Sequence, residues 1–531
     1  MSFDMEKMAV IQGKTALGIE FGSTKIKAVL IDFSYNQLAE GSCHWRSSYK
    51  NGNWTYLLDE AIAGMQSCYQ NLSKEISDKY NVSLERVGVI GISGMMHGYL
   101  PFDQDGRQLT EFRTWQNITT ETAADELTKL LDFNFPQRWS ACHLYQAILN
   151  REDHVKDIAY LTTLSEYIHY RLTGKRVIGV GDASGMFPID NRTLDYDVTM
   201  LQQFDKLVAG QIKVPWKIRM LLPDILSAGK MAGMLTPEGA RLLDPSKKLL
   251  PGIPFCPPEG DAGTGMVATN AVSPRTGNVS AGTSIFLMAV LEKPLRRIYP
   301  EIDVVATPDG RPVAMVHCNN CTQDMNAWIS IFCEFAKMMG GCTDPDQVYA
   351  HCYEKALEGN PDCGNWVMFN YLAGEQITGI DTGSPMIIRN PESNFNLANF
   401  CKMFFYSAFA TLRLGMDVME RERVQIDRLT GHGGLFRYSG IGQKFLSAAL
   451  KTSVHSMDYA ACGGPWGAAI LGLYTINRNA NESLSDFLNQ RVFSHVQTHV
   501  VKAEVSDMDG FDVFLQRYNS CLKLVRQAHS V

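Results

Sequence analysis

The sequence predicts an α/β protein in which one hairpin pattern occurs twice. Residues 15–32 contain two apolar, strand-like runs on either side of Gly22-Ser23-Thr24, as in a hairpin with a small-residue turn. Residues 279–287 repeat this order around Gly282-Thr283-Ser284. Backbone N–H groups and hydroxyls in such turns can clasp a phosphate. The two hairpins therefore predict a duplicated fold with one phosphate-binding turn in each half.

Helical segments separate and follow these hairpins. Apolar residues recur at helical spacing over 58–80, and a buried strand is expected at 87–92. The same periodicity predicts helices at 322–339, 396–422 and 440–450. Strands and helices thus share the chain, which defines the predicted class as α/β.

Composition indicates a globular protein with a large core. The chain has 531 residues, so more than one domain is expected, and 45% of the residues are hydrophobic while 20% are charged. A formal net charge of -7 argues against a nucleic-acid-binding protein that relies on a broad basic face. No apolar run reaches the ~18 residues of a membrane span. The N-terminus lacks the basic-then-apolar order of a signal peptide.

The cysteines fit a reducing compartment. There are 13 of them, an odd number, and they are scattered without a disulfide framework. Cys318-Asn319-Asn320-Cys321 has no second CxxC and no suitably spaced histidine, which argues against zinc. Buried free thiols are the favoured interpretation. We therefore expect a cytoplasmic protein.

The loop before the second hairpin holds the strongest candidate for chemistry. It reads Glu259-Gly260-Asp261-Ala262-Gly263-Thr264-Gly265 and leads into an apolar helical start. Small neighbours would let a substrate approach the carboxylate of Asp261, and backbone N–H groups at a helix start suit an anion. A carboxylate beside phosphate turns indicates phosphoryl transfer, in which catalysis is mostly positioning and charge stabilisation. Because Gly-Asp pairs are also common in ordinary turns, the loop alone fits a purely structural role equally well.

Other nucleotide-binding motifs are absent from the sequence. There is no G-x-x-x-x-G-K-[ST], so a P-loop is not supported. The HRD and DFG pairing of protein kinases is missing, and no convincing GxGxxG follows a strand. These absences disfavour the P-loop, protein-kinase and nicotinamide-binding classes.

Further glycine-rich turns are candidate binding elements. The segment 93–98, Ser-Gly-Met-Met-His-Gly, follows the predicted strand, and ligands of α/β sheets bind at strand ends. A lone His97 in a glycine turn is nevertheless more often structural. Gly433 and Gly434, followed by Phe436, would let a nucleoside approach the backbone closely. Residues 463–469 form a similar turn that opens a helix.

These turns, in this order, resemble the FGGY carbohydrate kinases over about residues 15–475. Within that family, the segments 93–98 and 182–186 are most similar to xylulokinase/ribulokinase-like pentulose kinases. The resemblance implies a two-domain actin/hexokinase/Hsp70-like (ribonuclease H-like) fold with ATP and sugar in the interdomain cleft. The implied parts are a sugar-binding N-terminal domain at 15–272, an ATP-binding C-terminal domain at 273–475, and peripheral C-terminal helices at 476–531.

The resemblance also implies an activity: ATP-dependent phosphorylation of the terminal hydroxyl of a ketopentose, D-xylulose or L-ribulose, to the 5-phosphate. Asp261 would be the general base, because an alcohol is a poor nucleophile that a positioned base assists. Glu20 and Asp261 would hold Mg²⁺. The implied sugar-binding residues are Met96, His97, Asn117 and Asp261. The implied ATP-binding residues are Gly22, Ser23, Thr24, Gly282, Thr283, Ser284, Gly433, Gly434 and Phe436.

Two positions depart from the family pattern. Glu20 stands where Asp is usual, and Asn117 stands where xylulokinases have Asp. Residues 299–389 match the family loosely, and nothing is carried over from them. A kinase for L-fuculose, L-rhamnulose or glycerol therefore stays open as an alternative, as do a non-catalytic sugar/ATP sensor and an actin-like filament former. The expected partner is a small-molecule sugar, without nucleic acid or membrane, and a homodimer is expected.

Overall fold

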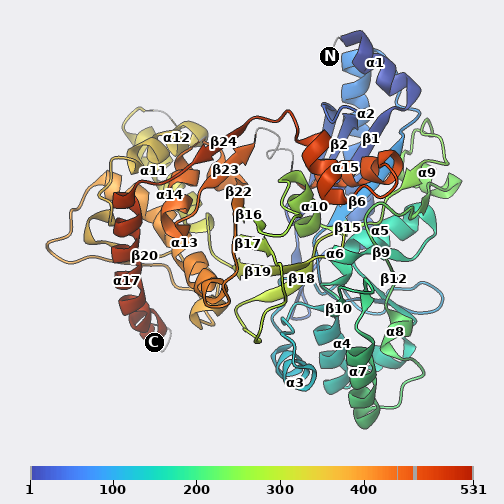
Figure 1. Cartoon of the computed structure of the whole chain (residues 1–531), viewed down its shortest axis with the longest axis horizontal. Helices are drawn as coiled ribbons and strands as arrows, with labels where there is room; N and C mark the ends of the chain where they lie inside the picture. Colours follow the sequence, from blue (N-terminus) through green and yellow to red (C-terminus); the bar gives the residue numbers. More distant parts are fainter. Residues whose placement is uncertain (1–2, 342, 439, 458–462, 529–531) are drawn as a thin grey trace. The chain divides into compact units, whose positions relative to one another are not determined.

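The computed structural model describes residues 3–341, 343–438, 440–457 and 463–528, which are coloured along the chain in Figure 1. Packing divides the chain into two compact units. Unit 1 comprises Met1–Ser273, Val304–Val313 and Cys462–His495. Unit 2 comprises Pro274–Asp303, Ala314–Ala461 and Val496–Val531. The first division coincides with the predicted boundary near Ser273-Pro274, but two later segments return to unit 1 instead of staying in a continuous domain 273–475.

Unit 1 is built on a mixed sheet whose centre is the first predicted hairpin. Its strands lie in the order β13 (Gly233–Met234), β14 (Pro254–Phe255), β6 (Val89–Gly94), β1 (Thr15–Phe21), β2 (Lys25–Asp32) and β3 (Gln37–His44). β1 runs antiparallel to β2 and parallel to β6, and the short β15 (Glu259–Gly260) also pairs in parallel with β6. The predicted hairpin at 15–32 is therefore confirmed.

Glycines let helices approach this sheet closely. Gly18 on β1 and Gly91 on β6 are partners in register. A Cβ atom on Gly18 would lie 1.8 Å from the carbonyl oxygen of Pro465, and one on Gly91 would lie 2.2 Å from that of Ala468. Both carbonyls belong to α15 (Gly463–Asn477), so this late helix packs on the central strands of unit 1 (Figure 1). This packing explains why 462–495 joins unit 1.

The remaining elements of unit 1 cover the sheet or extend it. α2 (Leu58–Tyr80), predicted from its periodicity, packs against β2 and β3. The other helices are α1 (Phe3–Gln12), α3 (Glu121–Leu131), α4 (Ser140–Leu149), η1 (Asp153–Asp157), α5 (Leu164–Thr173), α6 (Val180–Ala183), α7 (Val198–Gln211), α8 (Ile218–Leu221), α9 (Pro237–Leu243), α10 (Asp261–Ala268), α16 (Leu484–Phe487) and η6 (Leu488–Val492). The short strands are β4 (Ser48–Lys50), β5 (Asn53–Thr55), β7 (Leu100–Phe102), β8 (Tyr160–Thr162), β9 (Val177–Gly179), β10 (Ile189–Asp190), β11 (Asp195–Tyr196) and β12 (Asp224–Leu226).

Unit 2 repeats the hairpin arrangement of unit 1. β16 (Thr276–Ala281) is antiparallel to β17 (Ile285–Val290) and parallel to β22 (Arg428–His432), just as β1 is to β2 and β6. The sheet continues through β23 (Val454–Met457) to β24 (Thr498–Val501). The second predicted hairpin is therefore confirmed, and the two units share one local topology.

Helices and short strands complete unit 2. The predicted helices appear as α11 (Gln323–Met338), α13 (Leu397–Arg421) and α14 (Ile441–Leu450). The other elements after β17 are β18 (Asp303–Ala306), β19 (Pro312–Cys318), α12 (Pro345–Ala356), η2 (Cys363–Asn365), β20 (Val367–Phe369), η3 (Gln376–Thr378), β21 (Met386–Ile388), η4 (Gly434–Phe436) and α17 (Val505–Ala528). Of these, β18 falls mainly within the segment Val304–Val313 that belongs to unit 1.

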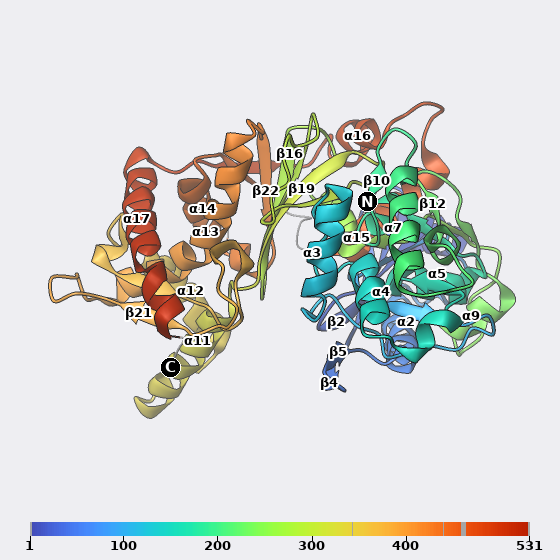
Figure 2. The same ribbon diagram turned by 90° about the horizontal axis from the view of Figure 1, so that it is seen from below.

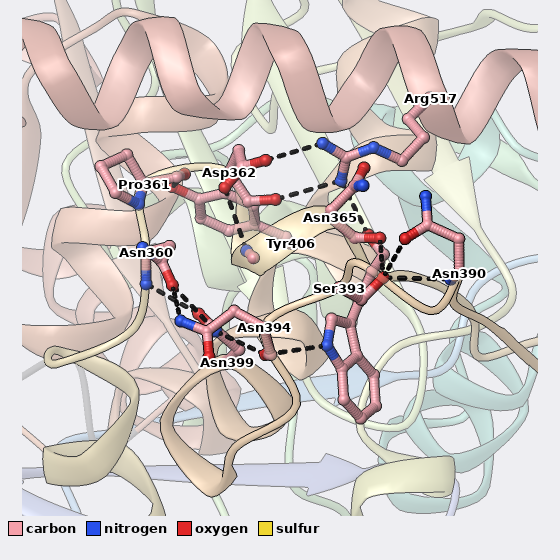
Figure 3. Close-up of polar contacts among 12 residues, drawn as sticks. Asn360, Pro361, Asp362, Asn365, Asn390, Ser393, Asn394, Asn399, Tyr406 and Arg517 are labelled. Atoms are coloured by element: carbon pink, nitrogen blue, oxygen red, sulfur yellow. Dashed lines mark hydrogen bonds and ion pairs between the residues drawn. The ribbon is translucent and has the colours of Figure 1, made fainter.

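The last helix, α17, differs from the peripheral helices expected at 476–531. It packs beside α13 and α14 in unit 2 (Figure 2) and buries Phe511, Phe514 and Tyr518 in the core. Figure 3 shows Arg517 of this helix donating to the carboxylate of Asp362 at 2.7 Å. The helix is part of the core of unit 2 because its apolar face is buried there. Arg517 on its other face forms the hydrogen bond to Asp362. Among the described helices, none has both the length and the apolar character needed to cross a bilayer.

Candidate active site

Strand pairing places Asp261 at the end of the unit 1 sheet. β15 pairs with β6 so that Gly260 lies opposite Gly94, and α10 begins at the next residue, Asp261. One carboxylate oxygen of Asp261 accepts a hydrogen bond from the backbone N–H of Ala262 at 2.9 Å. The helix start is pinned to β6 because the hydroxyls of Ser93 and Thr264 are 2.8 Å apart. The predicted base therefore stands at a strand end, at a helix N-terminus that favours negative charge.

Glu20 reaches the same region from β1. In the sheet register Glu20 lies opposite Ser93, whose hydroxyl contacts the α10 residue Thr264. A Cβ atom on Gly464 would lie only 2.5 Å from Oε1 of Glu20 and 3.1 Å from Oγ1 of Thr264. Because Gly464, at the start of α15, has no side chain, there is space for the side chain of Glu20, which is one methylene longer than an aspartate.

The charge of Glu20 acts on the carboxyl group of Asp261. Burial, and next the charge of Glu20, raise the pKa of Asp261 to about 7, while hydrogen bonds from the backbone of Ala262 and Met96 act in the opposite direction. Burial also raises the pKa of Glu20, against the influence of Lys27. A bound cation would offset the repulsion between two ionised carboxylates, and carboxylate oxygens are ligands that Mg²⁺ prefers.

A complete protein cage for a metal is not formed by the described side chains. Within that part of the chain, no group of three or more His, Cys, Asp or Glu side chains is arranged to hold a metal ion. Mg²⁺ commonly binds one or two carboxylates together with waters and substrate phosphates. Glu20 and Asp261 therefore fit a Mg²⁺ ion that arrives with a phosphate-bearing ligand.

Met96 and His97 lie beside the Asp261 loop. The side chain of Met96 packs over Gly260, where a Cβ atom would be 2.2 Å from Cγ of Met96. His97 has a φ of 70°, an unusual backbone conformation for a side-chain-bearing residue, and its Nδ1 lies 3.2 Å from the carbonyl oxygen of Gly185. Its ring also stacks on Trp139 at a centroid separation of 6.4 Å. The structure thus brings Met96 next to the predicted base, whereas His97 contacts Gly185 and Trp139.

Asn117 has a different environment. Its side chain is 2% exposed, and its amide group donates to the carbonyl oxygens of Trp54 and Thr114 at 2.9 and 3.1 Å. Its carbonyl oxygen accepts from the backbone N–H of Trp54 at 2.8 Å. These bonds join the loop 112–117 to β5, so the side chain has a structural role in this conformation.

Two buried carboxylates missed by the sequence reasoning support the Asp261 loop. Oδ2 of Asp182 accepts from the hydroxyls of Thr163, at 2.7 Å, and Ser165. Glu259, two residues before Asp261, accepts from the backbone N–H groups of Gly181 and Asp182 at 3.3 and 3.0 Å. Burial raises the pKa of Asp182 to about 6 and that of Glu259 to about 8. The motif at 182–186 was a signal of similarity, but it did not reveal this pairing.

The first phosphate turn is closed and braced within unit 1. The N–H of Gly22 donates to the carbonyl oxygen of Lys25 at 3.0 Å, which leaves Ser23 and Thr24 at the tip. The indole of Trp45 donates to the carbonyl oxygen of Gly22 at 2.6 Å, and the hydroxyl of Tyr56 donates to that of Ser23 at 2.7 Å. The N–H of Gly22 and the carbonyls of Gly22 and Ser23 are therefore occupied, which leaves the N–H groups and hydroxyls of Ser23 and Thr24 for an anion.

The second turn has the same construction within unit 2. The N–H of Gly282 donates to the carbonyl oxygen of Ser284 at 2.9 Å, and Thr283 is exposed at the tip. Backbone N–H groups of Cys321 and Thr322 donate to the carbonyl oxygens of Thr283 and Gly282 at 3.0 and 3.1 Å. A Cβ atom on Gly282 would meet no atom within 4 Å, so the backbone here is open to a ligand.

The predicted adenosine-side residues follow β22 in unit 2. Gly433 has a φ of 100°, and a Cβ atom there would lie 2.6 Å from the carbonyl oxygen of Ala281, so glycine is required. Gly434 is exposed, and a Cβ atom on it would meet no atom within 4 Å. The ring of Phe436 packs against Gly431 and is 8% exposed in the core. The two glycines therefore present open backbone beside the second turn, whereas Phe436 anchors the segment.

Comparisons with known proteins identify the class to which this fold and site belong. The FGGY family of carbohydrate kinases matches the chain with its N-terminal domain over residues 15–267 and with its C-terminal domain over residues 277–476. The chain therefore belongs to the FGGY family of carbohydrate kinases. The predicted fold class and the prediction of a sugar kinase are confirmed.

Relatives within the family include several kinases. The chain is 23% identical over 469 residues to the xylulose kinase of Haemophilus influenzae, covering 84% of this chain and 89% of that protein. It is 24% identical over 295 residues to the glycerol kinase of Thermococcus gammatolerans, covering 53% and 55%. The crystal structure of a ligand-bound xylulose kinase from Lactobacillus acidophilus matches with a TM-score of 0.78 at 15% identity, covering 96% of this chain and 98% of that one.

Proposed function

We propose that the protein transfers the terminal phosphoryl group of ATP to the terminal hydroxyl of a ketopentose, D-xylulose or L-ribulose, giving the 5-phosphate. The observation that carries this proposal is the position of Asp261, at a helix start beside Met96 and Glu20. The likeness to a xylulose kinase across 84% of the chain supports the choice of sugar.

Asp261 acts as the general base in this proposal. The sugar hydroxyl oxygen attacks the γ-phosphorus of ATP, its proton passes to the carboxylate of Asp261, and the bond from that phosphorus to the bridging oxygen breaks to release ADP. A base works best when its pKa lies near the working pH, and burial together with the charge of Glu20 raises the pKa of Asp261 to about 7. Mg²⁺ held by Glu20 and Asp261 would offset the phosphate charge.

The remaining predicted residues bind and orient the substrates. The open turns at Gly22-Ser23-Thr24 and Gly282-Thr283-Ser284 would hold phosphate oxygens through N–H groups and hydroxyls. Gly433 and Gly434 would let the adenosine approach the backbone. The buried His97 would donate or accept a hydrogen bond with a sugar hydroxyl, while Met96 would cover the carbon skeleton.

A polyol or another ketose is the second candidate class of substrate. Glycerol kinases match about half of the chain, and a rhamnulokinase matches about a third. Asn117 stays a predicted sugar contact in this proposal, and its side chain is positioned by hydrogen bonds to the backbone of Trp54 in β5.

The proposal is tested by ADP release with magnesium-ATP against D-xylulose, L-ribulose, D-ribulose, L-fuculose, L-rhamnulose and glycerol. We expect a strong preference for one ketopentose. The absence of sugar-stimulated ADP release across the panel, with ATP binding intact, would contradict the proposal and favour a non-catalytic sensor. Preference for glycerol or a deoxyhexulose would retain the kinase but overturn the assigned substrate.

We also propose that the protein works in a reducing compartment such as the cytoplasm. The cysteines that the structure describes are free thiols, and several of them, including Cys142 and Cys318, are fully buried. Unchanged electrophoretic mobility and thermal stability with and without a reducing agent are expected.

A further inference from the structure

A cavity outside the candidate active site lies in unit 1, around the start of α5. It has a volume of about 320 Å³. Its walls come from β8, α5, α8 and the start of β12. Figure 1 shows α5, α8 and β12 in the same part of the unit. The lining residues are Tyr160, Leu161, Glu166, Arg176, Arg219, and residues 220–224. None of them belongs to the candidate active site.

Glu166 is the polar group buried in this cavity. Its side chain is 1% exposed, and one carboxylate oxygen, Oε2, accepts from the hydroxyl of Thr162. The other oxygen, Oε1, is buried without a hydrogen-bond partner among the described residues. Burial raises the pKa of this carboxyl group to about 8. Buried polar atoms are nearly always hydrogen-bonded, so an unsatisfied oxygen on a residue that lines a cavity indicates a missing partner such as a ligand.

Arg176 supplies a positive charge at the exposed rim of the cavity. Its guanidinium group lies 3.6 Å from the ring centre of Tyr160 and 5.3 Å from that of Tyr170. In the described part of the chain, no carboxylate forms a salt bridge with it. Arg219, by contrast, pairs with Asp224 at 2.8 Å and with Asp195 at 3.9 Å. The cavity thus offers one guanidinium group, that of Arg176 beside two aromatic rings, to an anionic group of a ligand.

We propose that this cavity is an effector site for a small hydroxylated anion, such as a sugar phosphate or a sugar acid. The anionic group would pair with Arg176, and a hydroxyl would donate to Oε1 of Glu166. Leu161, Leu222 and Pro223 would cover the carbon skeleton. The volume falls at the small end of ligand pockets, which suits a compact metabolite better than a nucleotide.

The effector role follows from the residues next to Glu166. Thr163 caps α5 by accepting from the N–H of Glu166, and the same hydroxyl donates to Asp182. Ser165 donates to Asp182 as well. The backbone N–H of Asp182 in turn donates to Glu259, two residues before Asp261, at 3.0 Å. A ligand that binds Glu166 and displaces it would therefore shift the turn that holds Asp182, and this shift would change the environment of the proposed base, Asp261.

Binding is measured first, by isothermal titration calorimetry without ATP or ketose, so the result does not depend on the proposed reaction. The probes are D-ribose 5-phosphate and D-gluconate, with D-ribose and inorganic phosphate as partial ligands. We expect saturable binding of at least one complete probe, weaker binding of both partial ligands, and a loss of about tenfold or more in Arg176→Gln. Preference between the two complete probes identifies phosphate or carboxylate as the anionic group.

Lys175→Gln is the matched control, because Lys175 is an exposed cation adjacent in sequence that does not line the cavity. It should bind as the wild type does. Absence of saturable binding, or equal affinity in wild type and Arg176→Gln, would overturn the site. In the ADP-release assay, the saturating probe should change kcat or KM by about fivefold, and Arg176→Gln should abolish the change. Binding without such a change would overturn the effector role.

Discussion

The two hairpins share a construction but differ in charge. The turns of the β1–β2 and β16–β17 hairpins each contain an exposed threonine, Thr24 and Thr283. In each hairpin the first strand also pairs in parallel with a third strand, β6 or β22. The residue before the last residue of the first strand is Glu20 in one hairpin and Ser280 in the other. In register, Glu20 lies opposite Ser93 and Ser280 opposite His432. One topology thus carries a carboxylate in unit 1 and a neutral hydroxyl in unit 2.

This difference separates two roles within a duplicated fold. A turn of N–H groups and hydroxyls suffices to bind phosphate, whereas a metal or a developing charge requires a carboxylate. Unit 1 provides Glu20 and Asp261, and unit 2 provides the open backbone of Gly282 and Gly434. In the proposed function, unit 1 therefore carries the chemistry and unit 2 mainly holds the nucleotide.

The largest effect is expected for Asp261→Asn. The substitution preserves shape but removes the base on which unit 1 depends, so kcat should fall by about 100-fold or more. Steady-state kinetics with the best sugar of the panel measures the loss, and ATP binding should be retained. Near-normal turnover would mean that unit 1 does not supply the base.

A smaller loss is expected for Glu20→Gln. Removing the second carboxylate weakens the proposed Mg²⁺ site, so kcat should fall by about tenfold and the Mg²⁺ concentration for half-maximal rate should rise. Ser280→Ala, the matched change in the other hairpin, should leave the Mg²⁺ dependence unchanged. If Glu20→Gln and Ser280→Ala showed the same Mg²⁺ dependence, the proposal that only the first hairpin contributes to the Mg²⁺ site would be contradicted.

Gly464→Ala tests the space around Glu20. A Cβ atom there would lie 2.5 Å from Oε1 of Glu20, so the carboxylate must move away. We expect kcat to fall by about fivefold, which is less than the tenfold loss expected for Glu20→Gln, where the charge is removed altogether. Thermal stability should change little. Gly210→Ala is the control, since a Cβ atom on this α7 residue meets nothing within 4 Å. Full activity of Gly464→Ala would show that the position of Glu20 is not critical.

The smallest effect is expected in the second hairpin. Thr322→Val removes the hydroxyl that donates to the carbonyl oxygen of Gly282 at 2.8 Å but keeps the backbone N–H bond. Since one brace of two is lost, KM for ATP should rise by about threefold with kcat nearly unchanged. A fall in kcat without a change in KM would instead give this hairpin a role in the chemical step.

Much of the fold followed from local patterns. The hairpins at 15–32 and 279–287 and the helix at 58–80 were predictable because alternation and helical periodicity are set by nearby residues. The return of α15 to unit 1 was not, because it rests on contacts of Gly18 and Gly91 with a helix near the other end of the chain. Local patterns carry no record of such long-range packing.

The candidate site divides in the same way. Asp261, Met96 and His97 were predicted from glycine-rich turns at strand ends, where loop chemistry is visible in the sequence. Asp182 and Glu259 were missed because their role depends on hydrogen bonds between segments brought together by folding. Asn117 was chosen by resemblance, but its side chain bonds to the backbone of Trp54, a partner that no motif indicates.

The most direct test of the Glu20–Asp261 pair is the pH dependence of kcat/KM for the sugar at saturating magnesium-ATP, in wild type and Glu20→Gln. A base must be ionised, so the wild-type rate should rise as pH increases through the pKa of Asp261, which burial and the charge of Glu20 raise. The charge of Glu20 raises that pKa, so its removal should move the rise to lower pH. An unchanged position of the rise would contradict electrostatic coupling between the two carboxylates.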